Sequence, residues 1–233
     1  MESIGIDETK LILGHQVADK EVKCLYSLAQ KAKEGAIVEI GSNRGRSTVY
    51  LAKGAEKGGH GNRVYAIDPH YEGTEQVFKE NIKKLELDNI VIPLIMKSEE
   101  AIKQWRQPIS RLFIDGAHDY ENVKRDFTLW EPYLNTGGVI CLHDKFDEGP
   151  ARVIREHVLL SNRFSQIRVV QGLLYAIKNG SITSQDRFNR FYLLAWTYLA
   201  SGFHILTRPS YMRPVKHFIV RAGFGRVGGK TGT

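Results

Sequence analysis

Apolar and polar positions repeat with two different periods along residues 36–178. Short apolar runs rich in β-branched residues predict buried strands, because each run is too short for a helix. Between these runs, apolar residues recur three and four positions apart, which predicts amphipathic helices. The predicted strands are 36–40, 64–67, 90–96, 111–114 and 139–142, and the predicted helices are 17–33, 45–57, 73–87, 98–105, 120–134 and 151–160.

The order of these elements predicts an α/β fold. Five strand–helix units in succession favour a parallel sheet with helices on both faces. Residues 164–170 and 173–177 are then two strand-like runs separated only by Gln171-Gly172, which indicates an antiparallel hairpin. We therefore expect a Rossmann-like sheet, 36–180, between an N-terminal helical segment, 1–35, and a C-terminal extension, 181–233.

Charge separates the extension from the rest of the chain. The 233 residues carry a net charge of +7, and residues 181–233 hold eight Lys/Arg against one acid. Residues 1–180 are therefore neutral overall, so composition predicts no nucleic-acid partner for the main domain. The two cysteines, Cys24 and Cys141, are too few for a disulfide scaffold. The first residues lack the pattern of a signal peptide, so we expect a cytoplasmic protein.

Acidic residues stand at the ends of four predicted strands: Glu39, Asp68, Asp115 and Asp144. The carboxyl ends of parallel strands meet at one edge of a sheet, where ligands of such folds bind. Because four carboxylates at one edge repel each other, we expect a cationic ligand, either a sulfonium or a metal ion. The alternative is that these acids only cap the helices that follow.

The loop after the first strand reads Gly41-Ser42-Asn43-Arg44-Gly45-Arg46-Ser47-Thr48. It lacks the glycine spacing of a dinucleotide fingerprint and the Gly-Lys-Ser/Thr ending of a phosphate loop. Together with the hairpin, this disfavours an NAD-linked oxidoreductase. Asp68 at the end of the second strand suits the hydroxyls of a ribose.

Over residues 36–178 the chain resembles the class I S-adenosylmethionine-dependent methyltransferases. It is most similar to small bacterial O-methyltransferases related to the macrolide-sugar methyltransferases and the cephalosporin-hydroxylase proteins. The motifs that carry the resemblance are 39–48, 66–68, 113–121 and 137–144. The resemblance implies a Rossmann-like class I methyltransferase sheet and S-adenosylmethionine contacts by Glu39, Gly41, Ser42, Ser47, Asp68, Ser98 and Asp115. Within that set, Ser47 would bind the methionine carboxylate, Asp68 the ribose, and Ser98, also the expected N-cap of helix 98–105, would border the adenine.

Asp115, His118 and Asp144 are the predicted catalytic residues. If the fourth and fifth strands are neighbours, ~4.8 Å apart, Asp115 and Asp144 can share one Mg²⁺. In the related metal-dependent families, the residue three after the first aspartate is a base, and here it is His118. The alternatives are that His118 or Asp144 caps a helix, or that Asp144 pairs with Lys145.

One position departs from the catechol-type pattern, because Lys145 stands where those enzymes complete the metal site. An ammonium cannot coordinate a metal and would repel it. A third ligand then comes from elsewhere, water fills the place, or the metal is absent. We expect His143 to point away from Asp144, because neighbouring residues of a strand face opposite sides.

These observations predict an O-methyltransferase acting on a hydroxyl of a small or glycan-type acceptor. Two alternatives stay open: a cofactor-binding scaffold without activity, and a methyltransferase of phenols or catechols. The acceptor itself cannot be read, because fold does not fix substrate.

The extension contains an uncharged run, 191–207, at the lower length limit for crossing a bilayer. Wound as a helix, 187–208 places Arg190, Thr197, Ser201, His204 and Arg208 on one narrow stripe. Because the run contains Gly202 and His204, we do not expect it to form a transmembrane helix. Two predictions remain: the helix packs on the body or on a second copy of the chain, or residues 187–226 contact an anionic membrane surface.

Overall fold

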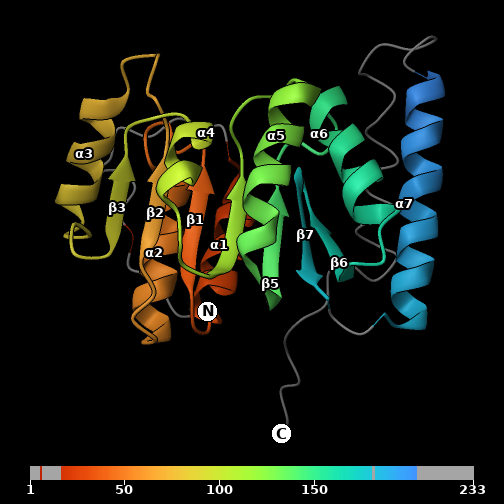
Figure 1. Cartoon of the computed structure of the whole chain (residues 1–233), viewed down its shortest axis with the longest axis horizontal. Helices are drawn as coiled ribbons and strands as arrows, with labels where there is room; N and C mark the ends of the chain where they lie inside the picture. The colour runs from red at the N-terminus through yellow and green to blue at the C-terminus, as the bar shows by residue number, and fades with distance from the viewer. Residues whose placement is uncertain (1–5, 7–16, 180–181, 204–233) are drawn as a thin grey trace, which may run out of the picture.

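A seven-stranded sheet forms the centre of the molecule, with helices on both faces (Figure 1). The computed structural model describes residues 6, 17–179 and 182–203. The strand order is β3-β2-β1-β4-β5-β7-β6, in which the first five strands are parallel and β7 is antiparallel to both neighbours. The strands are β1 (Ala36–Ile40), β2 (Val64–Ile67), β3 (Val91–Leu94), β4 (Ile109–Ile114), β5 (Leu134–Leu142), β6 (Phe164–Val170) and β7 (Leu173–Lys178).

Two apolar cores join the helices to the sheet. On one face pack α1 (Asp19–Gln30), α2 (Arg46–Gly58) and α3 (Glu75–Lys84). On the other pack α4 (Ser98–Ala101), α5 (Tyr120–Trp130) and α6 (Glu148–Val153), continued by the 3₁₀ turns η2 (Ile102–Gln104) and η3 (Glu131–Tyr133) and by the π-helical turn η4 (Ile154–Leu159).

The strand sequences explain this two-sided burial. All five residues of β1 are buried, so the strand shows no polar alternation, as expected of a parallel strand covered on both faces. Large side chains fill the cores from both sides, including Trp130, Phe113 and Phe127, none more than 1% exposed. Each such side chain stabilises the fold by about 1.5–3 kcal/mol.

The predicted chain order is confirmed, including the terminal hairpin of β6 and β7. Two local predictions were wrong. Residues 134–138 belong to β5, which we predicted to begin at 139, because pairing of Ile109 with Leu134 starts the strand earlier. Lys97, not Ser98, is the N-cap of α4, and the Ser98 hydroxyl donates to Asp126 instead.

The last described helix, α7 (Ser184–Phe203), stands beside β6 at one end of the sheet (Figure 1). The expectation that the extension begins with a helix packed on the body is confirmed for this range. Among the helices described, none combines the length and the apolar character needed to span a bilayer. His204, Arg208 and the rest of the predicted contact segment up to 226 lie outside the described residues.

Candidate active site

The carboxyl ends of the five parallel strands open onto a cleft of ≈ 760 Å³. Segments that follow every one of these strands line it, as expected for ligand binding in an open α/β sheet. The predicted site residues on its wall are Gly41, Asp68, Ser98, Asp115, His118 and Asp144. Residues separated by more than 100 positions in sequence therefore share one cleft.

Gly41 allows two loops of the cleft to touch. Its φ of +92° is unfavourable for other residues, and a Cβ there would stand 2.2 Å from the Asp115 carbonyl oxygen. The Asp115 amide donates to the Ile40 carbonyl at 2.8 Å, which completes the contact. A glycine is required here because any side chain would force β1 and β4 apart at the cleft.

Asp68 is held in place by two backbone amides. Its Oδ2 accepts from the Asn43 amide at 2.8 Å, and its Oδ1 accepts from the His70 amide at 2.6 Å. One amide belongs to the glycine loop after β1 and the other follows β2. Each oxygen can accept a second hydrogen bond, so the carboxylate is set to receive the two hydroxyls of a ribose.

The far wall of the cleft carries a paired serine and aspartate. The Ser98 hydroxyl donates to Asp126, a residue of α5 that is 6% exposed. Burial raises the pKa of Asp126 to about 6, although the Ser98 hydroxyl opposes this shift. Asp126 was not among the predicted site residues, because its place on a helix at i+11 from Asp115 carries no recognisable motif.

The other predicted cofactor residues lie deeper. Ser42 and Ser47 line a small cavity that adjoins Gly41. Glu39 lines neither space: it is fully buried in β1, and Thr48 of α2 donates to its carboxyl. Burial raises the pKa of Glu39 to about 8. The predicted cofactor contacts of Glu39, Ser42 and Ser47 stay predictions.

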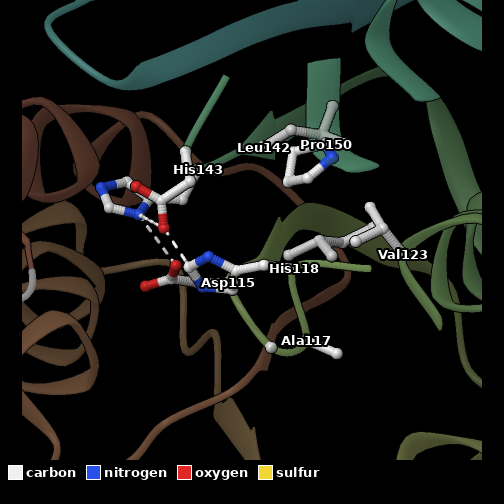
Figure 2. A pocket seen from close by; sticks show the side chains of 10 residues that line it. Asp115, Ala117, His118, Val123, Leu142, His143 and Pro150 are labelled. Atoms are coloured by element: carbon white, nitrogen blue, oxygen red, sulfur yellow. Dashed lines mark ion pairs between the residues drawn. The ribbon is translucent and has the colours of Figure 1, made fainter. Parts of the chain in front are cut away.

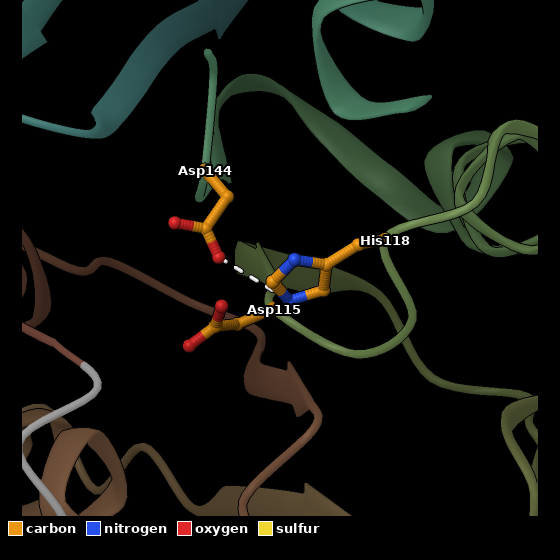
Figure 3. A group of neighbouring side chains, drawn as sticks. All are labelled: Asp115, His118 and Asp144. Atoms are coloured by element: carbon orange, nitrogen blue, oxygen red, sulfur yellow. Dashed lines mark ion pairs between the residues drawn. The ribbon is translucent and has the colours of Figure 1, made fainter. Parts of the chain in front are cut away.

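Asp115, His118 and Asp144 converge at the end of the cleft between β4 and β5 (Figure 3). One donor atom from each lies within 4.8 Å of the others. The adjacency of β4 and β5, on which this prediction depended, is confirmed by their parallel pairing. Figure 3 shows the imidazole of His118 and the carboxylate of Asp144 facing each other.

His118 is held between two carboxylates. Its Nε2 lies 3.2 Å from Asp144 Oδ2, and its Nδ1 lies 2.8 Å from Asp147 Oδ2. Gly149 permits this arrangement, because a Cβ there would stand 2.2 Å from the His118 carbonyl oxygen. The helix α5 is capped by Asp119, whose side chain accepts from Asn122, so the alternative of His118 as a cap is wrong.

Asp147 is a site residue that the sequence did not reveal. It occupies the N-cap position of α6, yet its side chain caps no amide and contacts His118 instead. We expect Asp147→Asn to lower kcat roughly tenfold, the loss of one charge-assisted hydrogen bond, and to leave cofactor affinity unchanged. Steady-state kinetics and cofactor titration measure both. Glu148→Gln, which removes the same charge one residue later, should change neither value; an equal loss in both variants would contradict the assignment.

His143 is the largest departure from expectation. Its Nδ1 lies 2.9 Å from Asp115 Oδ1 and 3.1 Å from Asp144 Oδ2, so the prediction that it points away from Asp144 was wrong (Figure 2). Asp144 has a left-handed φ of +47°, which turns the chain off the strand immediately after His143. Figure 2 shows the ring of His143 beside the Asp115 carboxylate, with a dashed line that marks the ion pair between them.

Glu21 of α1 completes the surroundings of His143. Its Oε2 lies 3.1 Å from His143 Nε2, and both side chains are at most 5% exposed. Burial lowers the pKa of His143, but the carboxylates of Asp115, Asp144 and Glu21 outweigh burial and raise it to about 12. His143 is therefore a buried cation between three acids. No sequence signal identifies Glu21, which lies 122 positions away.

Lys145 does not face the reaction centre. Its ammonium donates to the Gln171 carbonyl and lies 3.3 Å from the centroid of the Phe146 ring. The expected repulsion of a metal by Lys145, and its pairing with Asp144, stay predictions. After the left-handed turn at Asp144, the Lys145 amide donates to the Gly172 carbonyl of the hairpin.

The donor set fits a divalent cation. The carboxylates of Asp115 and Asp144, from adjacent strand ends, can share an ion, and their oxygen donors suit Mg²⁺. His143 contacts only one oxygen of each carboxylate, Oδ1 of Asp115 and Oδ2 of Asp144. The second oxygen of each accepts from neither histidine, so both acids retain a donor atom for an ion.

Comparisons with known proteins show what the domain is similar to. Residues 38–145 match the family model of a methyltransferase domain. An O-methyltransferase from Bacillus cereus, solved in complex with S-adenosylhomocysteine, is 23% identical over 72% of this chain and 84% of its own, with a TM-score of 0.58. An O-methyltransferase of tomaymycin synthesis from Streptomyces achromogenes, solved with S-adenosylmethionine, is 18% identical over 70% and 82%, with a TM-score of 0.56.

A third solved structure is a TDP-rhamnose 3′-O-methyltransferase of calicheamicin biosynthesis, 18% identical over 69% of this chain and 77% of its own, with a TM-score of 0.54. At these identities the likeness concerns the fold, while the family match covers the glycine loop, Asp68 and the Asp115–His118–Asp144 centre. Residues 38–145 are therefore similar to a methyltransferase domain, in agreement with the class I S-adenosylmethionine-dependent methyltransferases that the strand-end motifs resemble.

Proposed function

We propose that the protein transfers the methyl group of S-adenosylmethionine to a hydroxyl oxygen of a small or glycan-type acceptor. The observation that carries this proposal is the imidazole of His118, held between Asp144 and Asp147 on the wall of the cleft. Asp68, Gly41 and Ser98 line the same cleft, so the methyl donor and a base share one space.

The reaction is an in-line displacement in which the acceptor oxygen bonds to the methyl carbon as the carbon–sulfur bond breaks. The acceptor proton has to leave, and His118 accepts it at Nε2, because Nδ1 donates to Asp147. Once protonated, the ring can donate to both carboxylates, at 3.2 Å and 2.8 Å. Asp144 and Asp147 thus stabilise the imidazolium that the reaction produces.

Asp115 and Asp144 would hold a divalent cation beside this base. When bound, such an ion lowers the pKa of a hydroxyl and fixes its position. Buried His143 orients both carboxylates through contacts of 2.9 Å and 3.1 Å, whether or not the ion is present. The site therefore has a base and an ion position that act on the same hydroxyl.

A glycan-type acceptor is supported by two observations. The cleft is rich in polar side chains that can bind several hydroxyls, among them Asn43, Glu72, Asn122 and Arg125. A sugar O-methyltransferase is one of the structures with the same fold. Phenol or catechol acceptors, and a scaffold role without turnover, are the outcomes that the next experiment separates from this proposal.

The test is transfer of labelled methyl from S-adenosylmethionine to a panel of sugars, nucleotide sugars and catechols, with and without a chelator. We expect labelled sugar products, less product in excess chelator, and recovery on adding Mg²⁺. Full activity in excess chelator would contradict the role of the divalent cation but not the role of His118 as the base. Labelled catechols alone would contradict the glycan acceptor, and cofactor binding without product from any hydroxylated compound would favour a scaffold.

A further inference from the structure

The side of α7 that faces the body carries buried polar residues together with Leu193 and Leu194, which pack on the apolar core. Asp186, Asn189 and Arg190 are 1%, 3% and 8% exposed. The Arg190 guanidinium donates to the Leu159 carbonyl at 2.9 Å and also to the carbonyls of Ser161 and Phe164. These carbonyls lie at the end of η4 and the start of β6, where no further helical or sheet partner is available. Arg190 thereby binds α7 to the edge of the fold.

The opposite side of α7 presents aromatic residues to solvent. Phe188 is 63% exposed and Phe191 is 72% exposed, and their spacing of three places them on one side of the helix beside exposed Arg187. A helix on the surface of a globular protein normally buries its apolar residues and exposes its polar ones. In α7 this order is reversed for these residues, which indicates a further partner. We call Arg187, Phe188 and Phe191 the outer face of α7.

Apolar exposure gathers at this end of the molecule. Four large hydrophobic side chains are strongly exposed in the described part of the chain, and two of them are Phe188 and Phe191. A third, Leu160 at 59% exposed, stands between Leu159 and Ser161, whose carbonyls Arg190 binds. Three of the four exposed side chains are thus on α7 or next to the carbonyls that Arg190 binds.

Charge decides which partner fits the outer face. From residue 187 to residue 233 the sequence has eight Lys/Arg and no Asp or Glu. A second copy would place two such basic sequences together, and like charges oppose association. Three exposed apolar side chains also fall short of the roughly 800 Å² per partner that a stable dimer buries. An anionic lipid surface complements both the charge and the aromatic residues, which sit well at headgroup depth.

The helix α7 runs antiparallel to β7, toward the side of the molecule on which the parallel strands end (Figure 1). The outer face occupies the first turns of α7, at the end of the helix away from the cleft. We propose that the outer face of α7 binds the surface of an anionic lipid bilayer as a peripheral contact.

The test is co-sedimentation of the full chain with vesicles of phosphatidylcholine alone and of phosphatidylcholine with phosphatidylserine. We expect binding to the anionic vesicles that weakens with salt. Phe188→Ser with Phe191→Ser should weaken binding roughly tenfold or more, because two apolar side chains no longer enter the interface. Phe188→Leu with Phe191→Leu keeps apolar side chains at both positions and should restore most of the binding. Arg187→Gln should weaken it about fivefold.

The matched control is Lys83→Gln with Lys84→Gln on exposed positions of α3, at the opposite end of the sheet. This pair should leave vesicle affinity within about twofold of wild type, because these charges lie far from the contact. Three results would overturn the proposal: no binding to anionic vesicles, binding that the serine pair does not weaken, or a dimer without vesicle binding that the serine pair converts to a monomer. Methyl transfer to a soluble acceptor should be the same in all these variants, so failure here is distinct from failure of the proposed function.

Discussion

His118→Ala is expected to lower kcat by roughly 10²–10⁴-fold, the usual contribution of a general base. The variant removes the group that accepts the proton and leaves Asp144 and Asp147 facing each other without a histidine between them. Cofactor affinity should stay near wild type, because a base acts mainly in the transition state. Single-turnover methyl transfer and a separate titration with S-adenosylhomocysteine measure the two quantities.

His60→Ala is the matched control, since His60 is exposed and is not part of the cleft. It should leave both quantities unchanged. If His118→Ala and Asp144→Ala both retain wild-type kcat, the reaction centre lies elsewhere.

Asp68→Ala is expected to weaken cofactor binding by roughly 10²–10⁴-fold. A carboxylate that accepts from two ribose hydroxyls contributes about 1.5–3 kcal/mol per hydrogen bond, and alanine removes both. The amides of Asn43 and His70 also lose their acceptor in this variant, so the glycine loop loses a tie to the end of β2. Equilibrium dialysis with labelled S-adenosylmethionine measures the effect.

Asp68→Asn is the informative companion, because its amide keeps one acceptor oxygen. Its dissociation constant for S-adenosylmethionine should lie between those of the wild type and of Asp68→Ala. Asp88→Asn, on the turn between α3 and β3 and outside the cleft, removes the same charge and should bind as wild type does. An unchanged dissociation constant for Asp68→Ala would contradict the ribose role.

Much of the fold was predictable because its signals are local. The strand at 36–40 is a continuous apolar run, and the helix after it begins at a glycine, so periodicity alone places both. The start of β5 was not predictable, because Leu134 joins the strand only through its pairing with β4. Ser98 resembled an N-cap in sequence, but Asp126 from a distant helix takes its hydroxyl.

The acidic centre was predictable to the extent that strand ends share one edge. Asp115 and Asp144 meet because β4 and β5 are neighbours. His143 was misplaced because strand alternation fails at a left-handed residue, and Asp144 gives no local sign of its φ of +47°. Glu21 and Asp147 could not be found from the sequence, since each reaches a histidine through a helix that packs across the fold.

The extension illustrates the same limit. Arg190, the first residue of the predicted polar stripe, faces the body and not solvent. The side chains of the other four residues of the stripe lie outside those that the structure describes. Sequence periodicity identifies the two sides of a helix without saying which side is covered. Arg190 points toward the body because its guanidinium donates to carbonyls at the end of η4 and the start of β6.

Calorimetric titration of the intact protein with S-adenosylhomocysteine tests the central claim most directly. Asp68, Gly41 and Ser98 on the walls of one cleft predict saturable binding at one site per chain. The same titration with NADH should give no binding, because the loop 41–48 lacks the dinucleotide fingerprint. Saturable binding of NADH, with none of S-adenosylhomocysteine, would contradict the account.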